Sequence, residues 1–176
     1  TCEDKEYLNW VLHLQEKGFE IASHGTSFTR SSRERIIAGL EAFRSCFGDW
    51  PRVLAQHNDK VVSESIYWGE NRVSGNNRRI YKGFLALKSS NGDIFHGERE
   101  GSPYFWGDIC RDHITYVRNF VYRDINTLRA CPMMPYHDPK RPYVNYWFAS
   151  TEAPDCRSFV TRLSKNNLDK LQKERG

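Results

Sequence analysis

The chain has no apolar run approaching the roughly 20 residues that a membrane-spanning helix needs, so its 176 residues predict no membrane span. It also lacks the charged and then apolar segments of a signal peptide after Thr1. Because the first residue is not Met, we expect the sequence to be cut from a longer chain. Hydrophobic residues make up 39% and aromatic residues 14%, which predicts a folded core.

Cysteine pairs with metal-binding spacing are also missing. The five cysteines are widely spaced, and none lies in a Cys-x-x-Cys pair: Cys2, Cys46, Cys110, Cys131 and Cys156. This pattern argues against a zinc knuckle, and the odd number in a chain of this length argues against a disulfide framework. We therefore expect reduced, mostly buried thiols, which favours a reducing compartment such as the cytoplasm.

A strong excess of one charge is absent as well. The 26 basic and 22 acidic residues give a net charge of +4. The basic residues are spread along the chain, whereas nucleic-acid-binding domains concentrate them in a patch. We expect charged pairs such as Arg33 and Arg35 to lie on solvated helix faces, and we expect no nucleic-acid partner.

Helical and strand patterns alternate along the chain. Helices are expected at 3–17, from a capping box at Ser31 and Glu34 to Gly48, at 105–112 and from Pro154 to about Glu174. Strands are expected at 19–22, 52–55, 114–118, 127–131 and 143–149, with an irregular excursion over 60–101. This order predicts an α/β fold with a parallel sheet, in a single domain covering residues 1–176.

Histidine and aspartate follow several of the predicted strands. His24 ends one strand, His57 and Asp59 end the next, and His137 and Asp138 follow a third. If these strands are neighbours in a parallel sheet, their carboxyl ends bring the side chains to one edge. Imidazole and carboxylate groups bind hydrolytic zinc and serve as general acids and bases. Each group could instead be a hydrogen-bonded loop or turn residue, without a catalytic role.

The segment from Gly18 to Thr26, Gly-Phe-Glu-Ile-Ala-Ser-His-Gly-Thr, resembles the second motif of the polysaccharide deacetylase family, the NodB-like carbohydrate esterases of family 4. The resemblance is strongest over residues 8–32. It implies a distorted seven-stranded (β/α) barrel, which this chain would contain only in part because both ends are truncated. It also implies hydrolysis of an acetyl amide or ester on a carbohydrate, with zinc or another divalent metal as cofactor.

Carried onto this sequence, the family's metal ligand is His24. The family's second histidine would fall at Phe28, which cannot ligate a metal, and its Asp-Asp motif would precede Thr1. We therefore expect weak zinc binding or none in this chain. The catalytic candidates are His57 and Asp59, and His57 could also replace the missing ligand.

The substrate-binding candidates are Tyr136, His137 and Asp138. The aromatic residues Tyr104, Trp106, Tyr136, Tyr143, Tyr146 and Trp147 could form a sugar-stacking surface or belong to the core. A second interpretation is therefore a barrel that binds glycan without turnover, and a third is a basic nucleic-acid-binding domain.

Overall fold

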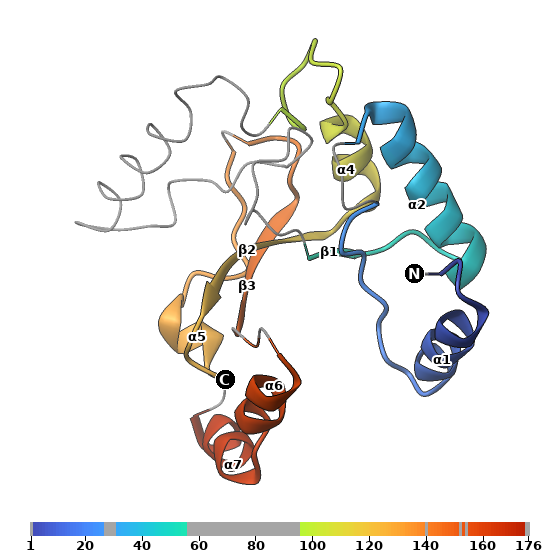
Figure 1. The fold of residues 1–176 in the computed structure, drawn as a ribbon. Helices are drawn as coiled ribbons and strands as arrows, with labels where there is room; N and C mark the ends of the chain where they lie inside the picture. The colour runs from blue at the N-terminus through green and yellow to red at the C-terminus, as the bar shows by residue number, and fades with distance from the viewer. Residues whose placement is uncertain are drawn as a thin grey trace.

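The computed structural model describes residues 2–26, 31–55, 96–139, 141–151, 153 and 155–174. Figure 1 shows the elements, which are α1 (Lys5–Glu16), α2 (Arg33–Phe47), β1 (Val53–Leu54), α4 (Gly107–His113), β2 (Tyr116–Tyr122), α5 (Thr127–Ala130), β3 (Tyr146–Thr151), α6 (Cys156–Arg162) and α7 (Lys165–Glu174). Among the described residues, no helix is long and apolar enough to cross a membrane.

The strands form a parallel sheet in the order β1-β2-β3. Ser23 extends it, because this residue forms a parallel bridge to Leu54. The Ser23 amide donates to the Val53 carbonyl at 2.9 Å, and the Ala55 amide donates to the Ser23 carbonyl at 2.8 Å. Counting the Ser23 segment, the sheet has four strands, all parallel. The expected α/β class with a parallel sheet is confirmed.

The core runs across the middle of this sheet. Leu54 pairs with Val117, and Val117 pairs with Trp147, so these buried side chains form one row that begins at Ser23. Helix α2 and the segment around α4 add further apolar residues, and the buried cluster contains Ile36, Leu40, Leu54, Trp106, Cys110, Ile114, Val117, Cys131, Met134, Val144 and Trp147. Burial of this much apolar surface is the main force that holds the helices on the sheet.

An ion pair joins the first turns of α2 and α4, which lie side by side in Figure 1. Both terminal nitrogens of Arg33 donate to the carboxylate of Asp108, each at 2.7 Å. The planar guanidinium matches a carboxylate in this two-bond geometry. Hydrogen bonding from Arg33 also lowers the pKa of Asp108. Arg33 was expected to lie on a solvated helix face. It is partly exposed, and it also binds Asp108 specifically.

Helix α2 agrees with its prediction at one end and differs at the other. Gly48 ends the helix with φ of 86°, a left-handed conformation that glycine adopts without strain. The N-cap is Ser32 instead of the expected Ser31, and its side chain makes no capping hydrogen bond. No strand forms at residues 19–22, where one was expected, and the pairing in this segment is the single bridge at Ser23, one residue later.

Two predictions in the second half of the chain are wrong. The strand expected at 127–131 is helix α5, because Asn126 acts as its N-cap and accepts a hydrogen bond from the Arg129 amide at 2.9 Å. The single final helix is divided into α6 and α7 at Leu163 and Ser164. There the Asn167 side chain donates to the Thr161 carbonyl at 3.0 Å, which satisfies an acceptor at the end of α6.

Candidate functional site

His24 lies at the carboxyl end of the short strand segment around Ser23. Ser23 is buried in the sheet, and its hydroxyl accepts a hydrogen bond from the Gly25 amide at 3.3 Å. Gly25 has φ of 122°, which side-chain-bearing residues rarely adopt, so the chain turns away from the sheet at once. His24 is thereby left exposed at the edge where parallel α/β folds form their active sites.

The loop that carries His24 is packed against α2. Thr26 and Ser31 are joined by a hydrogen bond between their hydroxyl groups at 3.4 Å. A β-carbon added at Gly39 in α2 would lie only 2.5 Å from the Thr26 methyl carbon. Only glycine at position 39 therefore allows this close approach, and α2 helps to position the loop that presents His24.

The two catalytic candidates, His57 and Asp59, lie outside the described residues, as does Phe28. In sequence they follow β1, which is the strand that pairs with Ser23. Their convergence with His24 stays a prediction.

His137 lies at the other end of the sheet from His24. Tyr136 forms an antiparallel bridge with Trp147, so His137 lies next to Asn145, just before β3 begins. His137 Nδ1 donates to the Asn145 carbonyl at 2.8 Å. The expectation that His24 and His137 share the carboxyl edge is wrong, because the chain around Tyr136 runs antiparallel to β3.

Asp138 belongs to a buried charged cluster with Glu98 and Arg141. Asp138 is only 2% exposed, and the Arg141 amide donates to its carbonyl at 2.8 Å. The Arg141 guanidinium donates to Glu98 Oε1 at 2.9 Å, and the Glu98 side chain is 8% exposed. Burial raises the pKa of Glu98 to about 7, Arg141 opposes this rise and Asp138 adds to it. Glu98 can therefore exchange a proton near neutral pH, as a general acid or base must.

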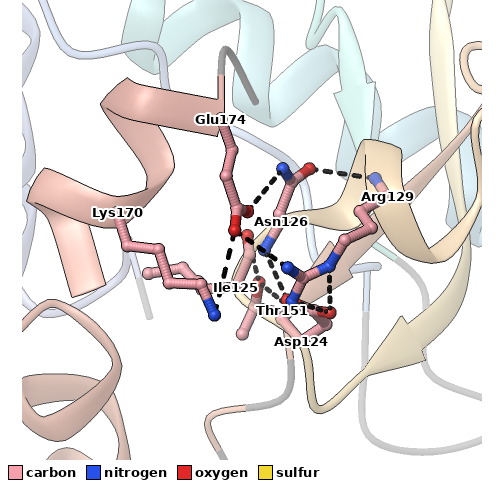
Figure 2. A network of polar contacts seen from close by, with 7 residues as sticks. All are labelled: Asp124, Ile125, Asn126, Arg129, Thr151, Lys170 and Glu174. Atoms are coloured by element: carbon pink, nitrogen blue, oxygen red, sulfur yellow. Dashed lines mark hydrogen bonds and ion pairs between the residues drawn. The ribbon is translucent and has the colours of Figure 1, made fainter.

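A network of polar contacts occupies the carboxyl ends of β2 and β3 (Figure 2). Arg129 in α5 donates to Asp124 at 2.6 Å and to Glu174 in α7 at 2.9 Å. The Asn126 side chain donates to the second oxygen of Glu174 at 3.1 Å. The Thr151 hydroxyl donates to the Asp124 carbonyl at 3.1 Å and so joins the ends of the two strands. Arg129 thus connects α7 to this edge of the sheet.

A surface depression of about 390 Å³, largely open to solvent, adjoins the network and is lined by Asn126, Leu128, Arg129 and Glu174. Hydrogen bonding from Arg129 lowers the pKa of Asp124, so this carboxyl is charged at neutral pH and serves as an acceptor. The depression is bordered by the hydrogen-bonded side chains of Asn126, Arg129 and Glu174 and by Leu128.

The described residues do not complete a metal site. Within them, no three His, Cys, Asp or Glu side chains are grouped closely enough to hold a metal ion. His24 is the one residue of the expected ligand set that they include.

Comparisons with known proteins identified no relative of this chain. No family model, no curated protein and no solved structure matches the chain. Any assignment of function therefore rests on the sequence motif and the geometry described above.

The sequence analysis did not predict the buried position of Glu98 or the polar network around Arg129. Glu98 lies 43 residues before Arg141, so no local pattern signals their contact. For Arg129 a local signal exists, since Asn126 three residues earlier is a favourable N-cap residue.

Proposed function

We propose that this protein is a hydrolase of the polysaccharide deacetylase kind, which removes an acetyl group from a carbohydrate by cleaving an amide or ester bond. The observation that carries the proposal is the position of His24, which is exposed directly after a buried, parallel-paired residue. It lies within the Gly18–Thr26 segment that resembles the family motif. The proposal includes a distorted (β/α) barrel, of which the parallel sheet would be a part.

The proposed reaction needs a group close to the acetyl carbon that accepts or donates a proton. A water oxygen adds to that carbon, the bond to the sugar nitrogen or oxygen breaks, acetate leaves, and a proton goes to the sugar atom. An imidazole can carry this proton, or it can bind a metal ion that polarises the carbonyl. His24, which is exposed, is the group that we propose for either role, and the family resemblance favours metal binding.

His57 and Asp59 remain the proposed acid–base pair. They follow β1 in sequence, and β1 is the direct neighbour of the Ser23 segment. Asp138 is a weaker candidate for substrate contact, because it is buried with Glu98.

The test is acetate release from acetylated sugar oligomers, of both the N-acetyl and the O-acetyl type. His24→Ala should lower the rate by about 100-fold or more, which is the usual contribution of an acid–base or ligand group. The matched control is His13→Ala, since His13 is also an exposed histidine and lies on α1, outside the motif. The control should keep the rate of the unmodified protein.

Retention of full activity by His24→Ala would remove that residue from the reaction and with it the basis of the proposal. Elemental analysis of the purified protein should accompany the assay. A stoichiometric metal that is lost in His24→Ala, and retained in His13→Ala, would assign His24 as a ligand. A metal retained in both variants would favour the proton-carrying role.

Binding of glycan without turnover is the second candidate. Tyr146 is 44% exposed, and its ring centroid lies 5.9 Å from that of Tyr116 and 6.2 Å from that of His137. Exposed aromatic rings of this kind can stack on the apolar face of a sugar. If the protein binds glycan, releases no acetate, and loses binding in Tyr146→Ala, the binding interpretation replaces the hydrolase.

A further inference from the structure

Two helices far apart in the sequence expose large apolar side chains. On α1, Tyr7 is 46% exposed and Trp10 is 57% exposed. On α6, Phe159 is 54% exposed and Val160 is 69% exposed. Single exposed apolar residues are ordinary, but grouped ones mark interaction sites. The two helices lie well apart in Figure 1, so neither covers the other within one chain.

The exposed side of α1 is aromatic and acidic. Tyr7 and Trp10 are three residues apart and therefore share one side of the helix, with ring centroids 6.0 Å apart. Glu6 lies four residues before Trp10 and is its neighbour on the helix surface. Over residues 2–20, acidic residues exceed basic ones, since Glu3, Asp4, Glu6, Glu16 and Glu20 face only Lys5 and Lys17. This part of the surface therefore combines aromatic rings with negative charge.

The exposed side of α6 is apolar and basic. The Leu163 amide donates to the Phe159 carbonyl at 3.0 Å, so these two side chains lie one helical turn apart, and Val160 is next to both. Arg157 lies three residues before Val160 and is its neighbour on the helix surface. Over residues 155–174, basic residues exceed acidic ones, since Arg157, Arg162, Lys165, Lys170 and Lys173 outnumber Asp155, Asp169 and Glu174. This part of the surface therefore combines apolar groups with positive charge.

We propose that the α1 face of one copy of this protein binds the α6 face of a second copy. The α1 face consists of Glu6, Tyr7 and Trp10, and the α6 face consists of Arg157, Phe159, Val160 and Leu163. Each face offers apolar side chains for the other to bury and carries the opposite charge, which is the complementarity that selects a partner. Pairing of like faces would place equal charges together. This inference goes beyond the proposed hydrolase function and does not depend on it.

Contact between two different faces fixes how the copies can assemble. Two copies can make the contact once, which leaves one face free at each end for further copies. They can also make it twice, which closes a dimer. In both arrangements every α6 face in the assembly needs an α1 face from another copy.

The experiment measures self-association by sedimentation velocity over a range of protein concentrations. Trp10→Lys disrupts the α1 face and Val160→Glu disrupts the α6 face, both at exposed positions, and circular dichroism checks that each variant is folded. Each variant alone should associate at least about 10-fold more weakly than the unmodified protein. An equal mixture should form pairs with one chain of each kind, because each variant keeps the face that the other lacks. The control is Met133→Lys, an exposed apolar position outside both faces, which should associate normally.

Two cysteines report which faces meet. Cys2 precedes α1 and Cys156 begins α6. Both are exposed, so the expectation of mostly buried thiols is wrong for these two. A reagent with two maleimide groups should join Cys2 of one copy to Cys156 of another, and this product of doubled mass should be absent in Cys156→Ser.

The proposal is overturned if the unmodified protein is monomeric at every concentration or if the mixed variants do not associate. Products that join Cys2 to Cys2, or Cys156 to Cys156, would show that like faces meet and would also overturn it. Monomeric protein that binds vesicles of phosphatidylserine and phosphatidylcholine, and loses this binding in Val160→Glu, would assign the α6 face to a membrane surface instead.

Discussion

Replacing Glu98 by Gln tests the electrostatics of the buried cluster. The groups that face Glu98 are Arg141, which donates an ion-pair hydrogen bond at 2.9 Å, and the carboxyl of Asp138. Burial raises the pKa of the nearby Cys110 thiol, and the charge of Glu98 adds to this rise. Burial disfavours a negative charge on Glu98, the Arg141 guanidinium opposes this effect, and the Asp138 carboxyl adds to it.

The size of the effect follows from the pKa of Glu98. Burial raises this pKa from 4.5 to about 7, and each pH unit of difference between folded and unfolded protein corresponds to about 1.4 kcal/mol. The difference amounts to about 3 kcal/mol. Because the folded pKa is the higher one, the folded protein binds this proton more tightly. The stabilisation is present in full below about pH 4.5 and is lost as the pH rises to about 7.

Glutamine has the shape of a protonated glutamate and does not titrate. Glu98→Gln should therefore exceed the free energy of unfolding of the unmodified protein by less than about 1 kcal/mol at pH 5 and by more at pH 8. We expect a gain of about 3 kcal/mol at pH 8, because the pKa of about 7 already includes the stabilising effect of Arg141 on the charged form.

The assay is urea unfolding at pH 5 and pH 8, followed through the fluorescence of the buried Trp106 and Trp147. Glu41→Gln is the control, since Glu41 is exposed on α2 and the same change there should leave the pH dependence unaltered. A variant that is less stable than the unmodified protein at pH 8 would refute the reasoning. So would an identical fall in stability between pH 5 and pH 8 in both proteins.

Three further predictions concern other contacts. Gly39→Ala should destabilise the protein by about 1–3 kcal/mol despite the higher helix propensity of alanine, because the new methyl group meets Thr26; urea unfolding measures this, and a gain in stability would contradict it. Arg129→Ala should speed amide hydrogen exchange in α7 relative to α1, because the contact with Glu174 is lost; unchanged exchange would mean that other contacts hold α7. Trp147→Ala should cost about 3–5 kcal/mol by denaturant unfolding, because this side chain is fully buried, and a cost below 1 kcal/mol would place it outside the core.

Helices were predictable where the spacing of apolar residues and the residues at the helix ends indicate the same structure. Apolar residues at Ile36 and Leu40 predict α2, and Gly48 marks its end, as the structure confirms. The error at Thr127 arose because a β-branched residue favours a strand locally, whereas the cap at Asn126 favours a helix. The break at Ser164 was also visible in principle, since serine often precedes a helix.

The candidate site was predictable only in part. The motif around His24 is local, and the structure places this residue at the carboxyl end of its strand segment. The position of His137 depends on the antiparallel bridge at Tyr136, which no sequence period reveals. Glu98 is buried by the tertiary fold, which places it against Arg141, 43 residues away, so its raised pKa could not be foreseen from the sequence.

The most direct test of the central claim is mass spectrometry of the products formed from acetylated sugar oligomers in ¹⁸O-labelled water. The proposed hydrolysis predicts acetate that carries oxygen from the solvent, together with sugar that has lost the acetyl group. His13→Ala should form the same products, and His24→Ala should form almost none. Glycan that binds and is recovered with every acetyl group in place would contradict the hydrolase and support binding without turnover.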